Sequence, residues 1–223
     1  MITAPQTAEE HWRRLQAWVP DPETRFMARP TTPETIVRDA VAADAEAVAS
    51  IGRVAVPDTY KDLIDDAAVL EAIVEQSYAL DALRECIARC MSAADAHFLV
   101  AERDSRIVGF LHYDCQGPEP ELHRIYIEPA QKRRGIGSAL LQELHRRLAS
   151  GDSYILMVVA SNRPAVAFYE RHGLVEAARV DGVAYMHEQM GVEFAGGAPH
   201  VPALILRFTK QHEKAGTGDR RRG

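Results

Sequence analysis

ELHRIYIEPAQKRRGIGSALLQELHRRL, residues 121–148, is the stretch that decides the fold of this chain. It predicts a strand over Glu121–Ile127, a basic loop with two glycines, and a helix over Ile136–Ala149 whose apolar residues recur at helical spacing. The first turn of a helix presents unpaired N–H groups and a partial positive charge, and glycine lets a phosphate approach the backbone closely. The stretch therefore predicts a pyrophosphate-binding loop at the start of this helix.

Two other kinds of phosphate loop do not fit the spacing of these glycines. The P-loop requires a lysine directly after its last glycine, and no lysine follows Gly135 or Gly137. The dinucleotide-binding fingerprint requires a third glycine at the position that Leu140 occupies. The glycines therefore do not support a nucleotide-binding protein built on either loop.

A second motif, NRPAVAFYERHGL, follows in residues 162–174. Together the two segments resemble the GNAT superfamily of N-acetyltransferases. The acetyl-CoA loop of that family reads Gln or Arg, two residues, Gly, one residue, and Gly or Ala, after a strand. The downstream signature of the family is matched here by Asn162, Ala165, Tyr169, Gly173 and Leu174.

One loop position departs from the family pattern. Lys132 stands where Gln or Arg is usual, and Gln131 is displaced by one residue. Because such a loop holds pyrophosphate mainly through backbone N–H groups, we expect the lysine to be tolerated, and it keeps a cation near the phosphates.

The resemblance covers about residues 35–210 and implies the fold. It implies an α/β protein of the GNAT fold, with a mixed central sheet flanked by helices and splayed around a CoA-binding cleft. The cleft is expected between the strand that ends at Ile127 and the strand over 154–159. The predicted organisation is an N-terminal extension (1–33), a GNAT acetyltransferase domain (34–210) and a flexible basic tail (211–223).

The remaining elements are predicted from periodicity and from breaking residues. A helix over Ala43–Val54 is expected to end at the Val56-Pro57 break, and an amphipathic piece is expected over Glu9–Val19. The other expected elements are a strand at 35–39, helices across 66–91 with a break near Ser77, a hairpin at 97–113, a strand at 154–159, a helix at 163–172, and strands at 174–180 and 203–209.

The resemblance also implies acetyl-CoA as co-substrate and the residues that bind it. A backbone N–H on the strand Ile125–Ile127 is expected to meet the oxyanion, and the favoured donor is Ile127, beside a local bulge. Asn162 is expected to contact pantetheine or the acceptor, to cap a helix, or to do both. The cofactor-binding residues are Ile125, Ile127, Lys132, Arg133, Arg134, Gly135, Ile136, Gly137, Ser138 and Asn162.

Acetyl transfer to an amine needs a base, because an amine with a pKa of about 10.4 is neutral in only about one molecule in 2,500 at pH 7. Glu121 stands at the same offset from the loop as the catalytic glutamate of histone-modifying members of the family. His123 shares its strand face and is the rival, and either could act through water. Tyr169 matches the family position whose phenol reaches the CoA sulfur, so it is the expected general acid.

Composition limits the other classes of function. The chain has 223 residues and a net charge of −6, which does not suggest nucleic-acid binding and suits a cationic acceptor. It shows no apolar run near 18 residues and no apolar signal core, so we expect no membrane partner and a cytoplasmic location. Cys86 and Cys90 lie one helical turn apart without a second ligand pair, so packing is favoured over metal binding, and no metal is expected.

The sequence therefore predicts an N-acetyltransferase that moves an acetyl group from acetyl-CoA to a primary amine by direct attack through a tetrahedral intermediate. A small amine such as a polyamine is favoured as acceptor, and a peptide or protein amine stays open. The alternative is a non-catalytic acyl-CoA-binding sensor or assembly module of the same fold. A homodimer is left open.

Overall fold

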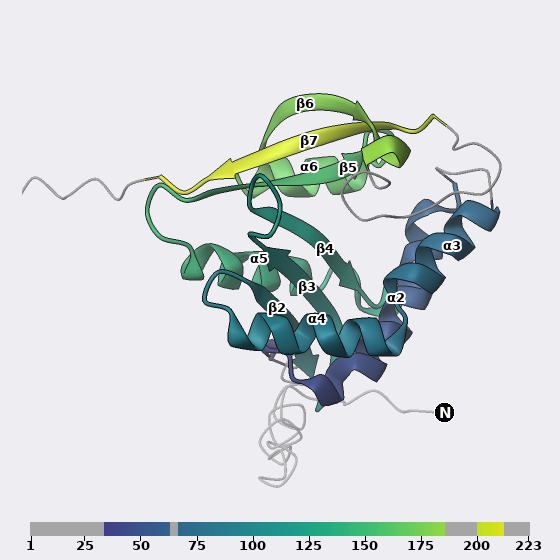
Figure 1. The fold of residues 1–223 in the computed structure, drawn as a ribbon, viewed down its shortest axis with the longest axis vertical. Helices are drawn as coiled ribbons and strands as arrows, with labels where there is room; N and C mark the ends of the chain where they lie inside the picture. The colour runs from purple at the N-terminus through teal and green to yellow at the C-terminus, as the bar shows by residue number, and fades with distance from the viewer. Residues whose placement is uncertain (1–33, 63–66, 186–199, 212–223) are drawn as a thin grey trace, which may run out of the picture. The chain divides into compact units, whose positions relative to one another are not determined.

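The structure is a computed structural model that describes residues 34–62, 67–185 and 200–211. The predicted N-terminal extension with its amphipathic piece, residues 186–199 of the late glycine-rich segment and the basic tail from 212 on lie outside the described residues. In chain order the elements are β1 (Ile36–Asp39), η2 (Ala42–Asp44), α2 (Ala45–Tyr60), α3 (Ala67–Ser77), α4 (Leu80–Ser92), β2 (His97–Arg103), β3 (Arg106–Asp114), β4 (Glu121–Ile127), η3 (Pro129–Gln131), α5 (Ile136–Arg147), β5 (Ser153–Val159), α6 (Arg163–Arg171), β6 (Val175–Asp181) and β7 (Pro202–Thr209) (Figure 1).

The strands form one mixed sheet of seven, in the order β1-β2-β3-β4-β5-β7-β6. All neighbouring strands run antiparallel except β4 and β5, which run parallel and pair only at Glu121 and Ile155. The Ile155 N–H also donates to the Pro120 carbonyl, at 2.9 Å. Beyond this point β4 and β5 part toward their carboxyl ends, which confirms the predicted splay of the sheet.

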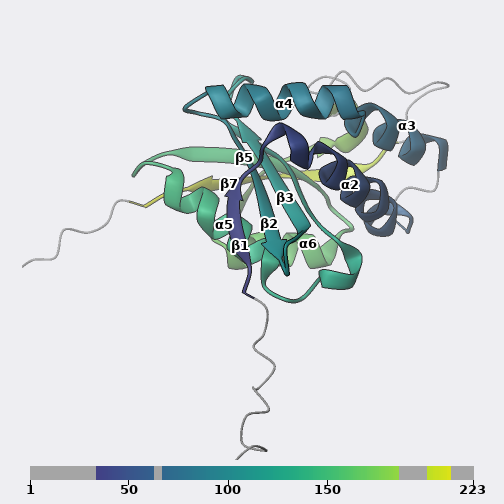
Figure 2. The same cartoon turned by 90° about the horizontal axis from the view of Figure 1, so that it is seen from below.

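Helices cover both faces of the sheet (Figure 2). α2 and α4 pack on one face, where Phe98, Val100 and Phe110 meet residues such as Val48 and Leu83. α5 and α6 pack on the other face, where Leu140, Leu141 and Leu144 of α5 and Val166 of α6 meet Leu99 and Leu111 of the sheet. Because β3 and β4 are held from both sides, the face of the sheet on which each of their side chains lies is fixed.

α2 continues through Pro57 to Tyr60, so the predicted break at Val56-Pro57 is wrong. A proline inside a helix costs about 3 kcal/mol, because it lacks an N–H and crowds the preceding turn. Here Val56 is buried in the core, Tyr60 packs against it, and the Lys61 N–H donates to the Pro57 carbonyl at 2.9 Å. The predicted interruption near Ser77 is confirmed, since α3 ends at this residue. None of the helices within the described ranges is long and apolar enough to cross a membrane.

Candidate active site

A cavity of about 670 Å³ opens where β4 and β5 part. Its walls come from β4, β5, the loop before α5, α6 and the last turn of α2. Arg134, which was expected to bind the cofactor, is not among the residues that line it. The predicted residues that do line it are His123, Ile125, Ile127, Lys132, Arg133, Gly135, Ile136, Gly137, Ser138, Asn162 and Tyr169.

The glycine loop has the geometry of an anion cradle. Gly135 caps α5 with φ of 79°, and Arg133 has φ of 64°, so both lie in the left-handed region. The Ala139 N–H bonds to the Gly135 carbonyl at 2.9 Å. The amides of residues 136–138 precede this bond and therefore have no carbonyl one helical turn behind them within the helix. A side chain at Gly137 would place its Cβ 3.3 Å from Phe168 Cζ, beside the cavity.

The loop carries two cationic side chains, Lys132 and Arg133, that line the cavity. Lys132 Nζ lies 2.7 Å from Asp58 Oδ2, which ties the loop to the last turn of α2 and lowers the pKa of Asp58. Arg133 lines the cavity. Lys132, which was expected beside the phosphates, also lines the cavity but is already paired with Asp58.

Tyr169 of α6 and Asn162, the residue that precedes this helix, line the same cavity. Tyr169 is half-buried, and burial, followed by the neighbouring Tyr60 phenol, raises its pKa well above the usual value. Asn162 accepts a hydrogen bond from the Ala165 N–H at 3.3 Å and so caps the helix. The capping interpretation of Asn162 is therefore confirmed, and its place in the cavity wall leaves a second role open.

A smaller cavity of about 80 Å³ adjoins the first. Glu121 and Tyr185 lie in its wall, together with residues of α2, α3 and β5. Sequence reasoning did not single out Tyr60, Arg124 or Tyr126, which stand between the two cavities. The side chains that line both are Tyr60, His123, Arg124, Tyr126 and Met157.

β4 carries its bulge at His123. The β3–β4 register runs from Tyr113↔Leu122 directly to His112↔Arg124, so His123 is an extra residue on β4. The bulge was expected beside Ile127, where the register is regular, so that expectation is wrong. Alternation already places His123 on the face that carries Glu121, and the extra residue adds Arg124 to that face.

The regular end of β4 still presents an N–H to the cavity. The Glu128 N–H donates to the Val108 carbonyl of β3 at 2.9 Å. Successive N–H groups of a strand point to opposite edges, so the Ile127 N–H points away from β3, toward the gap beside β5.

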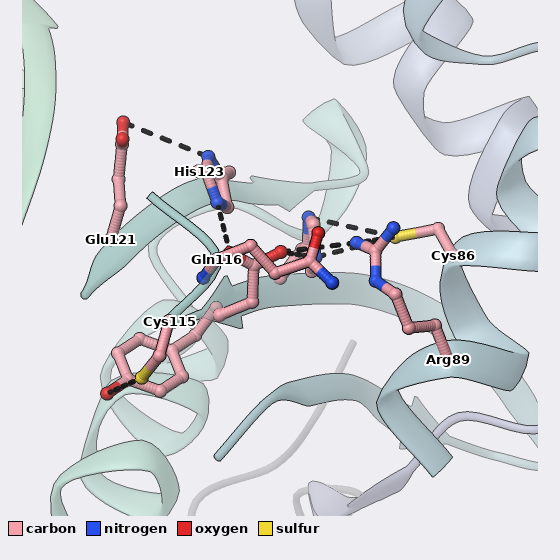
Figure 3. Close-up of polar contacts among 9 residues, drawn as sticks. Cys86, Arg89, Cys115, Gln116, Glu121 and His123 are labelled. Carbon is pink, nitrogen blue, oxygen red and sulfur yellow. Dashed lines mark hydrogen bonds and ion pairs between the residues drawn. The ribbon is translucent and has the colours of Figure 1, made fainter. Parts of the chain in front are cut away.

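Glu121 and His123 line the smaller cavity, and Asp114 contacts His123 (Figure 3). His123 Nε2 lies 3.0 Å from Asp114 Oδ1, and His123 Nδ1 lies 3.8 Å from Glu121 Oε1. Asp114 is buried, and its pKa is held far below the usual range: burial alone would raise it, but the hydrogen bonds from His112 and His123 outweigh that effect. A carboxylate on Nε2 makes that nitrogen the donor, so neutral His123 keeps its Nδ1 lone pair for the cavity.

Glu121 is buried at 9% exposure, and this burial raises the pKa of its carboxyl group above the usual value. Nearby His123 and a hydrogen bond with Tyr185 act in the opposite direction and are the smaller effects. A carboxylate with a raised pKa is a stronger base than an ordinary one. The structure thus brings both candidate bases, Glu121 and His123, to one cavity, although they are not in hydrogen-bond contact.

Comparisons with known proteins agree with this arrangement. The family model described as "Acetyltransferase (GNAT) domain" matches residues 94–176. Spermidine N(1)-acetyltransferase of Thermoplasma acidophilum is 26% identical over 148 residues, which cover 66% of this chain and 91% of that protein. Mycothiol acetyltransferase of Clavibacter michiganensis subsp. michiganensis is 37% identical over 82 residues, which cover 36% of this chain and 27% of that protein, so the chain spans only about a quarter of that relative.

Solved structures of other proteins have the same fold as this chain. The crystal structure of PaiA N-acetyltransferase from Thermoplasma acidophilum in complex with coenzyme A superposes with a TM-score of 0.63 at 22% identity. The superposition covers 80% of this chain and 99% of the PaiA chain. The splayed sheet is therefore shared with a protein that binds coenzyme A.

Proposed function

Because this chain is a member of the GNAT superfamily of N-acetyltransferases, we propose that it transfers an acetyl group from acetyl-CoA to a primary amine. One observation carries the proposal: a glycine-loop cavity and a cavity with two candidate bases adjoin where β4 and β5 part. An acetyl donor in the first cavity and an amine in the second would meet at the shared wall. The donor, the acceptor and the bases would then be in one place, which is the proximity that this reaction needs.

The loop and α5 form the proposed donor half. The amides of residues 136–138 and the Arg133 guanidinium would hold the pyrophosphate, and the Ile127 N–H would meet the negative charge that develops on the carbonyl oxygen. The cavity wall is open at Gly135, where a Cβ would meet nothing within 4 Å, and it is closely packed at Gly137. These features support a bound acetyl-CoA.

Glu121 and His123 form the proposed acceptor half. Deprotonating a lysine-like amine at pH 7 costs roughly 4.6 kcal/mol, at about 1.36 kcal/mol per pKa unit. The Glu121 carboxylate would attract the ammonium group, and Glu121 Oε1 or His123 Nδ1 would accept its proton. Asp114 acts as a positioning residue, since it fixes the ring of His123 through Nε2.

Tyr169 is the proposed general acid. Its phenol lies on the wall of the donor cavity, and its raised pKa keeps the proton on the oxygen until a basic thiolate appears. Burial in the same cavity would also raise the pKa of a thiol, so the basicities of the thiolate and the phenolate stay comparable there.

The charged residues around the smaller cavity, Glu121 and Arg124, favour different classes of amine acceptor. The spermidine enzyme among the relatives supports a small polyamine, which the Glu121 carboxylate would attract. Arg124 favours a second candidate, because this residue lines both cavities. Its Nη1 donates to the Ser77 carbonyl at 2.7 Å, but its buried Nε has no hydrogen-bond partner among the described residues. A cation there would repel a second ammonium group and attract a carboxylate, so an amino acid or a peptide is the alternative acceptor.

The test is release of free thiol from acetyl-CoA against a panel of polyamines, aminoglycosides, amino acids and peptides. Thiol release with one amine class supports the enzyme and identifies its acceptor. Thiol release with an amino acid and none with spermidine would favour the amino acid or peptide acceptor suggested by Arg124 over a polyamine acceptor. Binding of acetyl-CoA with no release across the panel would contradict transfer to these amines and favour a non-catalytic acyl-CoA-binding module.

A further inference from the structure

Two cysteines and a histidine meet on the α4 face of the sheet. Cys86 and Cys90 lie one turn apart on α4, and His112 lies on β3. Their two sulfur atoms and a ring nitrogen of His112 lie within 4.8 Å of one another. Cys90 and His112 are buried, at 7% and 4% exposure, and Cys86 is half-buried. The sequence favoured packing because no second ligand pair follows the cysteines, but the fold supplies a third ligand from a strand 22 residues further along.

We propose that Cys86, Cys90 and His112 bind one thiophilic divalent cation, with Zn²⁺ as the ion that this donor set fits best. Two thiolates and an imidazole are the ligands that zinc prefers. Donors about 2.0–2.3 Å from a tetrahedral zinc lie roughly 3.5–3.8 Å apart. Cys86 Sγ lies 3.4 Å from His112 Nε2, so this pair is already close to the spacing that a shared ion requires.

The surroundings of the three ligands suit a cation. Arg89 Nη2 lies 3.8 Å from Cys86 Sγ and 3.2 Å from Asp114 Oδ2, so a positive group already lies against this sulfur and this carboxylate (Figure 3). Arg89 is 44% exposed, and its guanidinium can move outward without unpacking α4. The half-buried sulfur of Cys86 then gives an ion a path to the two buried ligands. Three protein ligands leave the fourth position to water or to Asp114.

Asp114 would connect the metal site to His123, one of the two proposed bases, because it contacts both His112 and His123. His112 Nε2 lies 3.3 Å from Asp114 Oδ2, and the other oxygen of Asp114 is the one that holds His123. An ion bound to His112 Nε2 would replace the contact of this nitrogen with Asp114. The metal site itself does not depend on the acetyltransferase proposal, since none of its three ligands lines either cavity.

The test is a Co²⁺ titration of the tag-free, reduced full chain, followed by displacement with Zn²⁺. Thiol counting in denaturant first establishes that all three cysteines are free, so that oxidation cannot explain a negative result. We expect one equivalent of Co²⁺ to give a thiolate-to-cobalt charge-transfer band, with a Kd of about 1 µM or tighter, and Zn²⁺ to abolish the band. Bound Zn²⁺ should also protect two of the three thiols from alkylation.

Variants separate the proposed site from other ligands. Cys86→Ser changes a half-buried residue and should weaken Co²⁺ binding at least about 100-fold, because it removes a direct ligand. Cys115→Ser is the matched control: this cysteine contacts Tyr113 Oη at 3.4 Å, lies outside the cluster, and should bind Co²⁺ as wild type does. Thermal unfolding of both variants establishes that they fold.

Three results would overturn the proposal. They are the absence of a charge-transfer band at micromolar Co²⁺ with free thiols, unchanged binding in folded Cys86→Ser, and loss of binding in Cys115→Ser. None of these results bears on acetyl transfer, which the thiol-release assay tests separately.

Discussion

Replacing Glu121 by Gln separates catalysis from stability at the proposed acceptor site. The amide keeps the size of the side chain and can still hydrogen-bond with Tyr185, but it cannot take a proton from the amine. A positioned base contributes about 10²–10⁴-fold to such a reaction. His123 remains beside the cavity in the variant, so we expect the low end of this range, a loss of about 100-fold in kcat/KM, or roughly 2.7 kcal/mol of barrier.

The same change should not destabilise the fold. The folded-state pKa of Glu121 is raised, so its neutral form favours folding below the unfolded pKa, and this contribution is lost as the pH rises through the folded pKa. Above the folded pKa the wild type therefore holds a buried charge that the amide avoids. We expect the Tm of Glu121→Gln to equal or exceed that of wild type at pH 7, and the difference to shrink toward pH 4.

The assay is thiol release over a pH series with saturating acetyl-CoA, alongside thermal unfolding at the same pH values. Glu119→Gln is the matched control, because Glu119 is only partly buried, lies outside both cavities and pairs with Arg207 on β7, with 2.6 Å between Glu119 Oε2 and Arg207 Nη1. This control should retain activity within about twofold. Wild-type activity and an unchanged pH profile in Glu121→Gln would refute the role of Glu121, and a large loss of Tm would show that the side chain is mainly structural.

Three further changes test other parts of the account. Tyr169→Phe should lower kcat about 100-fold with acetyl-CoA affinity unchanged by calorimetry, and unchanged turnover would remove Tyr169 from the role of acid. Gly135→Glu should weaken acetyl-CoA binding at least about 100-fold, because it adds a negative charge and strains a left-handed backbone. A steric clash is not the cause, since nothing lies within 4 Å of an added Cβ. Affinity that survives this change would show that the pyrophosphate binds elsewhere. Asp44→Asn should cost about 1–3 kcal/mol at pH 7, because burial alone would raise the pKa of Asp44 but hydrogen bonds from Arg38 and the Val41 N–H outweigh it and lower this pKa. Denaturant unfolding should show this loss begin to shrink as the pH falls below about 4 and vanish below the lowered folded pKa, and a pH-independent loss would contradict it.

The parts of the site that sequence could predict are local in the chain. The glycine loop, the Asn162 cap and the strand Glu121–Ile127 lie in short segments whose spacing alone determines their geometry. The splay of the sheet came from the family resemblance, because no local pattern reports where two parallel strands stop pairing. The observed pairing of β4 and β5 at one residue pair confirms it.

The parts that sequence missed depend on contacts between distant elements. Asp114 and His123 are nine residues apart, and only the β3–β4 register and the bulge bring them together. Pro57 looked like a helix end, yet packing of α2 on the sheet keeps the helix intact and carries Tyr60 into both cavities. Lys132 was placed beside phosphate by its charge, and its partner Asp58 lies 74 residues away. Charge and spacing in the sequence allow several partners for such a side chain, and the packing of distant elements determines which contact forms.

Calorimetric titration of the full chain with acetyl-CoA tests the central claim most directly. We expect one site with a Kd in the range of about 1 µM to 1 mM that is typical of enzyme substrates, and loss of this heat in Gly135→Glu. Absence of binding to the folded wild-type chain would contradict the claim that the glycine loop between β4 and α5 holds acetyl-CoA.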